Sequence, residues 1–313
     1  MQNRITAILG TKYPLILGPM RLMTLGALAA AVSESGGFGQ IAASGASAEL
    51  LRSEIAKARG LTDKPLGVNM PIYRPNALEA LEIAIELGVR TVTTSAGNPT
   101  KMMGRIREAG LKVLHKVSTL DMALKAQDAG VDGVIATGYE AGGHIGREET
   151  TTFCLVPQLV DALDIPVVAA GGIGDGRGLL AALALGAEGV EVGTRFVATR
   201  ECPAPDFNKE AILKAVGAST LVLGKDMPIR VLRSRKALEI ADPEKAKQAA
   251  APGQSGDDVY VQAGGEADEA VMPAGQVASL IRAIVGAGEV FPEMVLDARA
   301  LAGRLEKFFK EET

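Results

Sequence analysis

The sequence predicts a (β/α)8 barrel, an α/β fold, with a small insertion between strand 8 and the last barrel helix. Short apolar or β-branched runs alternate with helix-like stretches, and the runs lack the alternation of a half-exposed sheet, so we interpret them as buried strands. Strict alternation implies parallel pairing, and eight units favour a closed barrel over an open doubly wound sheet. The eight expected strands are Pro14–Gly18, Phe38–Ala42, Leu66–Met70, Thr91–Ser95, Val113–Val117, Gly133–Thr137, Val167–Gly171 and Gly189–Thr194.

The stretches between these strands have helical character, and several end in a glycine before the next strand. Glycine is the expected residue for a left-handed helix C-cap, as at Gly88, Gly110, Gly130 and Gly186. Seven helices are expected here, and 273–285 supplies the eighth. The seven are Leu25–Glu34, Ala48–Ala58, Ala77–Leu87, Pro99–Ala109, Leu120–Ala129, Val156–Leu163 and Gly176–Leu185.

One segment, 198–272, breaks this repeat. It contains two candidate short helices, Ala211–Val216 and Ala237–Ile240. A stretch rich in Ala, Gly and Gln is expected to form a loop over Lys247–Asp258. An insertion after strand 8 would lie over the barrel mouth as a lid or substrate subdomain. We therefore expect a barrel of residues 1–197 and 273–313, closed by a terminal helix over Pro292–Lys310 with its charges on one side.

Composition restricts the class of protein. Hydrophobic residues make up 47% of 313 residues, which predicts a globular chain, and a formal charge of −4 argues against a nucleic-acid partner. Two cysteines fit a reducing cytoplasm, and the few His and Cys residues lie too far apart in sequence to indicate a metal site. The first ten residues do not resemble a signal peptide, and no apolar run reaches membrane-spanning length. We expect a cytoplasmic protein without a membrane partner.

A single histidine in a glycine-rich run, 138–146, is the strongest candidate for chemistry. The chain has only two histidines, and the run that contains His144, with glycines on both sides of it, directly follows the sixth expected strand. Glycine lets the backbone approach a flat ligand, and imidazole exchanges protons near neutral pH. The alternative is a surface turn that carries a polar residue. Ser95, Asn69 and Lys116 also fall at strand ends, which a barrel brings to one face.

Two glycine-containing turns after strands seven and eight predict a phosphate site. Gly171 and Gly172 end strand seven, while Gly193 and Thr194 end strand eight. Barrels commonly bind phosphate with these two loops through backbone N–H groups. The dinucleotide fingerprint is not matched, because Arg177 occupies its last glycine position. Each turn alone is also compatible with a tight strand-to-helix connection.

These motifs together resemble the nitronate monooxygenase (2-nitropropane dioxygenase) family of FMN-binding β/α barrels. The resemblance rests on 140–144 (EAGGH), 169–173 (AAGGI), 193–196 (GTRF), 67–69 (GVN) and 274–276 (AGQ), and runs from about Pro14 to Leu280. The same superfamily contains a flavin-dependent enoyl-[acyl-carrier-protein] reductase and an NADH:quinone reductase. The motifs are therefore specific for the superfamily and much less specific for one activity.

The resemblance implies a role for each matching residue. Gly171, Gly172, Gly193 and Thr194 would hold the FMN phosphate, and Pro19 and Met20 would lie against the isoalloxazine ring. Asn69, Lys116 and Gln276 would reach polar groups of the ring or ribityl chain. Adjacent strand residues point opposite ways, so only one of His115 and Lys116 faces inward; the resemblance selects Lys116, and His115 is expected to be packed.

Three functions are consistent with this pattern. The first is an FMN-dependent nitronate monooxygenase that acts on a small nitronate with O2, in which His144 serves as the base or binds the anion. The second is an NAD(P)H-dependent flavin reductase of enoyl thioesters or quinones. The third is a non-catalytic barrel that binds a phosphorylated ligand. The insertion's short length favours the first; the use of NAD(P)H, a homodimeric state and the involvement of Tyr139 or Glu140 stay open.

Overall fold

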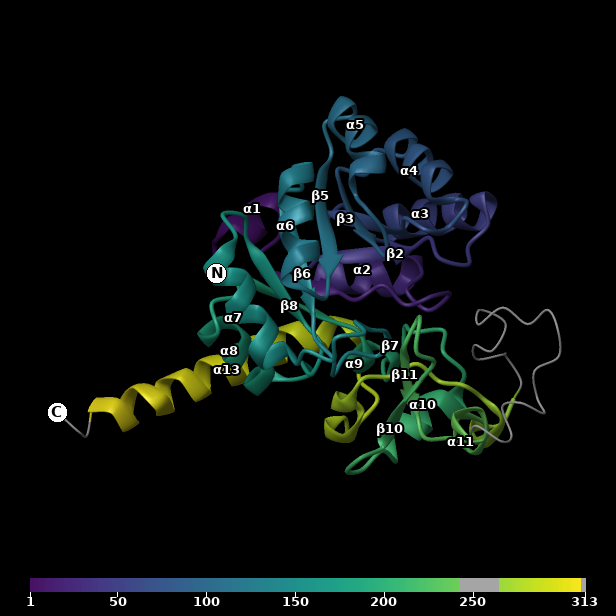
Figure 1. Cartoon of the computed structure of the whole chain (residues 1–313), viewed down its shortest axis with the longest axis vertical. Helices are drawn as coiled ribbons and strands as arrows, with labels where there is room; N and C mark the ends of the chain where they lie inside the picture. The colour runs from purple at the N-terminus through teal and green to yellow at the C-terminus, as the bar shows by residue number, and fades with distance from the viewer. Residues whose placement is uncertain (243–264, 311–313) are drawn as a thin grey trace.

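The computed structural model describes residues 1–242 and 265–310, and its centre is an eight-stranded parallel barrel (Figure 1). The strands pair in the order β1-β9-β8-β6-β5-β4-β3-β2, and a parallel bridge between Ile16 and Phe38 joins the first strand to the last. The predicted fold class is confirmed. The strands are β1 (Leu15–Leu17), β2 (Gly39–Ala42), β3 (Leu66–Pro71), β4 (Thr91–Ser95), β5 (Lys112–Val117), β6 (Gly133–Thr137), β8 (Val167–Ala170) and β9 (Gly189–Val192).

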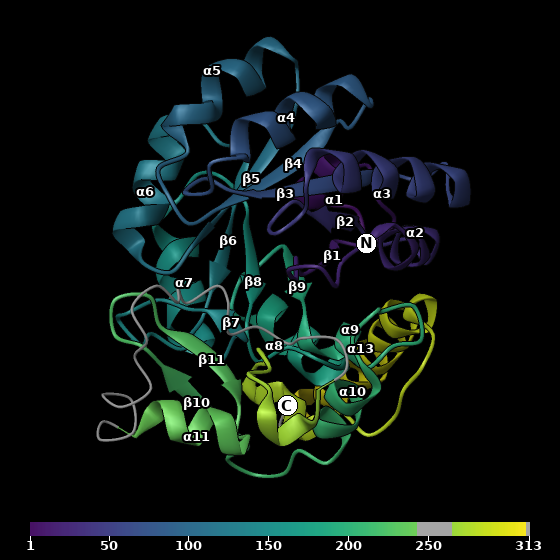
Figure 2. The same ribbon diagram turned by 90° about the vertical axis from the view of Figure 1, so that its right-hand side faces the viewer.

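The side chains of each strand alternate between the barrel interior and the layer under the helices. Ile16, Phe38 and Leu114 belong to one buried cluster, which also contains Ile5 and Leu9 of helix α1 (Arg4–Leu9). Because this cluster fills the barrel interior at its N-terminal end, the opening toward ligands lies at the C-terminal end of the strands. Figure 1 shows α1 to the left of the barrel strands and β7 and β11 to their lower right, and in Figure 2 the helices α3, α4, α5 and α6 lie around the strands.

The helices outside the barrel match the expected ones closely, because their apolar faces repeat at helical spacing. Helix α6 (Leu120–Ala129) has the predicted bounds and ends at Gly130, whose φ of 85° is the left-handed conformation that glycine adopts without strain. The remaining six are α2 (Gly26–Glu34), α3 (Ala48–Leu61), α4 (Ala77–Glu86), α5 (Thr100–Glu108), α7 (Thr152–Ala162) and α8 (Gly176–Ala184).

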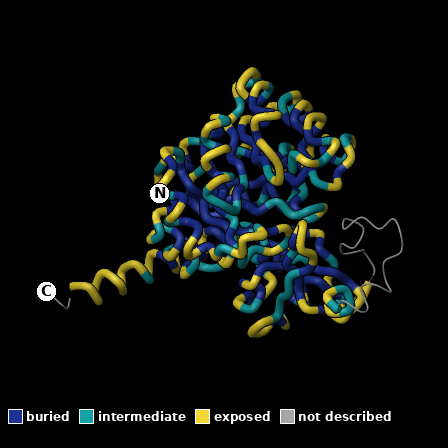
Figure 3. Tube along the Cα trace, in the orientation of Figure 1, coloured by how far each residue is buried: buried dark blue, intermediate teal, exposed yellow. Residues whose placement is uncertain are grey.

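The prediction of the eighth helix at 273–285 is wrong. That segment is extended around a short 3-10 turn, η2 (Gln276–Leu280), and bridges pair Pro273 with Val231 and Val285 with Thr199. The last barrel helix is α13 (Ala287–Lys310), which packs on α8 and α2 through buried residues as far as Ala298. The outer end of α13 extends past the barrel and is exposed (Figure 3), so only part of the predicted terminal helix packs.

The segment that follows β9 forms a second, smaller layer beside the barrel mouth. It begins with α9 (Thr194–Val197) and α10 (Asp206–Leu213), continues as the hairpin β10 (Thr220–Leu223) and β11 (Ile229–Leu232), and then forms α11 (Arg235–Ala241) and the short turn η1 (Ala267–Glu269). The hairpin, which the sequence did not predict, pairs with β7 (Gly143–His144) in a three-stranded antiparallel sheet. Helix α11 contains the predicted Ala237–Ile240, whereas the predicted Ala211–Val216 overlaps α10 only at 211–213. The predicted loop Lys247–Asp258 lies outside the described residues.

Candidate active site

A cavity of about 590 Å³ opens at the C-terminal ends of the barrel strands. Its size is typical of sites for small molecules and cofactors. The predicted site residues that line it are Pro19, Met20, Asn69, Lys116, His144, Gly171, Gly172, Gly193 and Thr194. Gln276 is not among the lining residues: its side chain is exposed, and its backbone N–H donates to the Glu140 carbonyl at 3.0 Å.

The two glycine turns present backbone rather than side chains to this cavity. Gly171 and Gly172 have φ of 100° and 72°, a region that L side chains rarely adopt, and a Cβ on Gly171 would lie 3.1 Å from the Gly138 carbonyl. Gly193 has an ordinary φ of −109°, and a Cβ there would have no neighbour nearer than Met20 Sδ at 4.0 Å. The space beside Gly193 is therefore open cavity, where a phosphate could approach the backbone.

Thr194 begins α9 beside this open space. Its Oγ1 accepts a hydrogen bond from the Gly275 N–H at 2.9 Å, and the residue is buried. That contact ties the turn after β9 to the segment that returns from the insertion. Since a hydroxyl also carries a proton, Thr194 can still donate to an anion.

A buried polar chain crosses the interior of the barrel below the cavity. Asn69 donates through Nδ2 to Thr93 Oγ1 at 2.8 Å, and Thr93 donates in turn to Gln40 Oε1 at 2.6 Å. Gln40 donates to the Leu17 carbonyl at 2.7 Å. Because each buried group in this chain has a partner, the position of Asn69 at the cavity is fixed by its neighbours.

Lys116 and its neighbour His115 face opposite sides of β5, as predicted. His115 is 1% exposed, its Nδ1 lies 2.8 Å from Thr94 Oγ1, and burial lowers the pKa of His115 to about 4. Lys116 instead lines the cavity and forms an ion pair with Glu191 of β9.

Glu191, whose side chain is only 4% exposed, was not predicted as a site residue from the sequence. The sequence does indicate that Glu191 is unusual, because its carboxylate interrupts an otherwise apolar strand, Gly189–Val192. A charged residue in a buried strand needs a partner or a ligand. Glu191 is both a lining residue of the cavity and the partner of Lys116.

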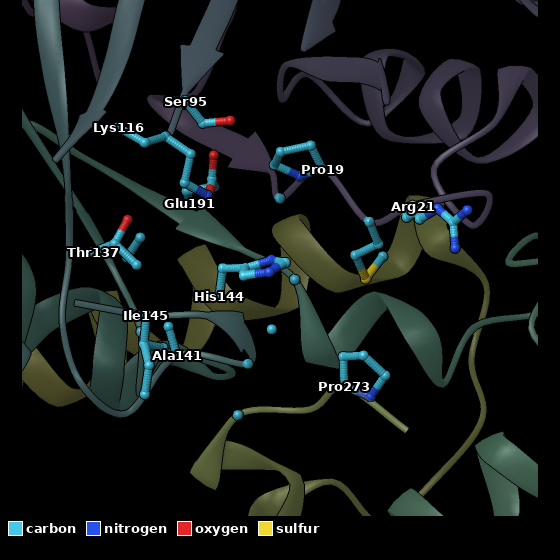
Figure 4. A pocket seen from close by; sticks show the side chains of 18 of the residues that line it. Pro19, Arg21, Ser95, Lys116, Thr137, Ala141, His144, Ile145, Glu191 and Pro273 are labelled. Carbon is cyan, nitrogen blue, oxygen red and sulfur yellow. The ribbon is translucent and has the colours of Figure 1, made fainter. Parts of the chain in front are cut away.

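His144 is held at the cavity by backbone pairing with the insertion. It lies on β7 opposite Ile229 of β11, and the next residue, Ile145, donates its N–H to the Pro228 carbonyl at 3.0 Å. Figure 4 shows the His144 ring pointing into the cavity, between Lys116 and Glu191 on one side and Pro273 on the other. The imidazole therefore faces the space that a ligand would fill.

Arg230 supports the loop that leads to His144. The side chain is 3% exposed, donates through Nε to the Tyr139 carbonyl at 3.0 Å, and stacks 4.7 Å from the centre of the Tyr139 ring. Its Nη1 donates to Thr220 Oγ1 at 3.1 Å, and burial lowers the pKa of this guanidinium. Tyr139 is thus bound to the hairpin and does not line the cavity.

Glu140 caps a helix at the edge of the cavity. Its Oε2 accepts from the Thr152 backbone N–H at 2.8 Å and from Thr152 Oγ1 at 3.1 Å, at the start of α7. A carboxylate at a helix N-terminus is favoured by the helix dipole. Arg21 and Arg74 add positive charge to the lining. In the described part of the chain no group of three or more His, Cys, Asp or Glu side chains is arranged to hold a metal ion.

The family model described as nitronate monooxygenase matches residues 2–297. The chain is 37% identical over 236 residues to "(3aS,4S,5R,7aS)-5-hydroxy-7a-methyl-1-oxo-octahydro-1H-indene-4-carboxyl-CoA dehydrogenase" of Rhodococcus jostii, a match that covers 75% of this chain and 66% of that protein. It is 35% identical over 267 residues to a "probable nitronate monooxygenase" of Staphylococcus saprophyticus, covering 71% of this chain and 75% of that protein.

Two solved structures resemble nearly the whole chain. FabK from Thermotoga maritima superposes with a TM-score of 0.87 at 36% identity, over 98% of this chain and 99% of that one. Nitroalkane oxidase from Streptomyces ansochromogenes superposes with a TM-score of 0.81 at 27% identity, over 97% and 100%. These likenesses agree with the observed barrel, and the family assignment indicates an oxidoreductase.

Proposed function

Since the chain belongs to the nitronate monooxygenase family, we propose that it is an FMN-dependent nitronate monooxygenase, which oxidises alkyl nitronates with O2. The observation that carries the proposal is the position of His144, an imidazole held by β7 in the same cavity as Lys116 and the two glycine turns. An anionic substrate is favoured there because the lining also contains Arg21 and Arg74.

The residues of the cavity fit FMN in the arrangement that the family resemblance implies. The phosphate would lie against Gly171, Gly172, Gly193 and Thr194, since a Cβ on Gly193 would fill open cavity and the glycines with positive φ keep backbone at the surface. Lys116 and Asn69 would contact polar groups of the ring or ribityl chain, with Pro19 and Met20 against the ring. We propose that the Gln276 side chain does not contact FMN. Gln276 would support the site only through its backbone N–H, which donates to the Glu140 carbonyl.

FMN, when bound, supplies the electron transfer between the nitronate and O2. The chain's own residues position the substrate and move its proton. His144 removes the acidic α-proton of a neutral nitroalkane, and as an imidazolium it holds the nitronate anion by a charge-assisted hydrogen bond. The β10–β11 hairpin, within 198–272, would cover the substrate side, and the described residues of 1–197 and 273–310 would make up the barrel domain.

Turnover with a defined substrate tests this proposal. The purified protein should contain noncovalent FMN, released by denaturation and distinguished from FAD by chromatography. Oxygen consumption should follow addition of propyl-2-nitronate without NADH or NADPH. A flavin-loaded enzyme that leaves oxygen unconsumed with alkyl nitronates of several chain lengths would reject the activity, and released FAD would reject the cofactor assignment.

A second candidate is an NAD(P)H-dependent flavin reductase of enoyl thioesters or quinones. The observations that favour it are the FabK match over 98% of the chain and two relatives, at 37% and 34% identity, whose names specify a carboxyl-CoA substrate. In this function His144 would polarise or protonate the thioester substrate. Consumption of NADH or NADPH that depends on an enoyl thioester, with no response to nitronates, would select this candidate.

A further inference from the structure

The floor of the cavity contains a carboxylate that the proposed chemistry does not use. Glu191 is 4% exposed and makes an ion pair with Lys116, which is 21% exposed, through Oε1. Its other oxygen, Oε2, is buried and has no hydrogen-bond partner among the described residues. Native proteins rarely leave half of a buried carboxylate unpaired, so this group requires an explanation.

The register of the strands shows that Glu191 faces the cavity. Thr137 of β6, Ala170 of β8 and Glu191 of β9 lie side by side in one row across three neighbouring strands. Ala170, between the other two, has only a small side chain, and all three residues line the cavity. Thr137 Oγ1 is likewise buried without a partner in the described part of the chain. The carboxylate therefore borders the ligand space above Ala170.

Lys116 and Glu191 act electrostatically as one unit. A buried ion whose partner is removed is strongly destabilised, because nothing else compensates its charge. While both are ionised their charges largely cancel at a distance. A single positive charge near the flavin would stabilise the negative charge that FMN acquires on reduction, and Glu191 reduces that effect.

We propose that Glu191 is a positioning residue that holds Lys116 at the cavity floor and limits the positive charge that Lys116 offers to FMN. The inference rests on the proposed binding of FMN in this cavity. It does not depend on whether a nitronate or NAD(P)H is the electron donor, so its failure is distinguishable from failure of the proposed activity.

The proposal predicts the direction in which each variant shifts the midpoint potential of the bound FMN. Glu191→Gln removes the negative charge and should raise the potential, so that the ratio of reduced to oxidised FMN at a fixed applied potential increases by about tenfold or more, equivalent to about 30 mV for two electrons. Lys116→Met should lower the potential. The double variant should lie between the two single variants, and Thr137→Val, in the same row but without a charge change, should shift the potential least.

The outcomes separate a structural role from an electrostatic one. A Glu191→Gln enzyme that holds FMN at an unchanged or lowered potential would overturn the proposal. If Glu191→Gln does not retain FMN, the double variant must bind FMN at least as tightly as Lys116→Met does, since removal of both charges leaves neither uncompensated. A double variant that binds FMN more weakly than Lys116→Met, while Thr137→Val keeps FMN, would equally overturn the assignment.

Discussion

Replacing Gly193 with alanine separates cofactor binding from protein stability. Gly193 has φ −109° and ψ −73°, a right-handed backbone conformation that alanine can adopt, and the new Cβ would meet only Met20 Sδ, at 4.0 Å. The apoprotein loses no contact and gains from the reduced entropy of its unfolded chain. We expect its stability to be unchanged or higher by at most about 1 kcal/mol, which raises Tm by no more than about 4 °C.

The same Cβ should weaken FMN binding, because it occupies the space through which the phosphate approaches the backbone. Loss of one hydrogen bond to a charged group costs about 1.5–3 kcal/mol. That cost corresponds to a Kd higher by about tenfold to about 150-fold. Fluorescence quenching of FMN added to the apoprotein measures the Kd, and thermal unfolding of the apoprotein measures stability.

A matched glycine far from the cavity serves as the control. A Cβ on Gly104, in α5, meets nothing within 4 Å, so Gly104→Ala should raise helix stability and leave the Kd for FMN unchanged. If Gly193→Ala binds FMN as tightly as the wild type, the phosphate does not lie at this turn. A large fall in the Tm of the Gly193→Ala apoprotein would show that the space beside Gly193 is not open.

Three further predictions follow from the site and its supports. His144→Ala should retain FMN and lose about 10²- to 10⁴-fold in rate with a neutral nitroalkane, but much less with the preformed nitronate. Near-wild-type rates with both substrates would show that His144 takes no part in the mechanism. Arg230→Met, which loses the hydrogen bond to Tyr139, should lower stability by about 1–3 kcal/mol and reduce turnover at unchanged FMN affinity. Arg233→Met, at an exposed residue directly after the same hairpin, should do neither. Because burial lowers the pKa of His115 from 6.5 to about 4, the unfolded chain binds more protons between these values, and stability should fall by at most about 3 kcal/mol as the pH drops through this window. His115→Gln should lack this part of the pH dependence, and an identical pH dependence in the two proteins would refute the assignment.

The barrel was predictable from sequence because each of its units carries a local signal. Buried parallel strands appear as apolar runs, and glycine C-caps mark where helices end. The opposite orientations of His115 and Lys116 follow from the period of two along β5, and both are confirmed. Since parallel barrel strands bring their C-terminal ends together, Asn69 and His144 were placed at one mouth although they are far apart in the chain.

The features that sequence analysis missed depend on contacts between distant segments. Gly143–His144 has no strand pattern of its own and becomes a strand only through pairing with Ile229 and Arg230. The segment 273–285 has helix-compatible apolar residues, yet its two ends form single bridges, Pro273 with Val231 of β11 and Val285 with Thr199, and the barrel helix is α13. Gln276 matched a family motif, but the motif does not determine the direction of its side chain, which is exposed where Gln276 begins the 3-10 turn η2.

Anaerobic reduction of the bound flavin tests the proposed function most directly. The oxidised enzyme would be mixed with propyl-2-nitronate, NADH or NADPH in separate experiments without oxygen, and the loss of flavin absorbance followed in time. The proposal predicts rapid bleaching by the nitronate and none on that timescale by either pyridine nucleotide. Rapid bleaching by NADH or NADPH, with the nitronate inert, would contradict it and identify the chain as a flavin reductase.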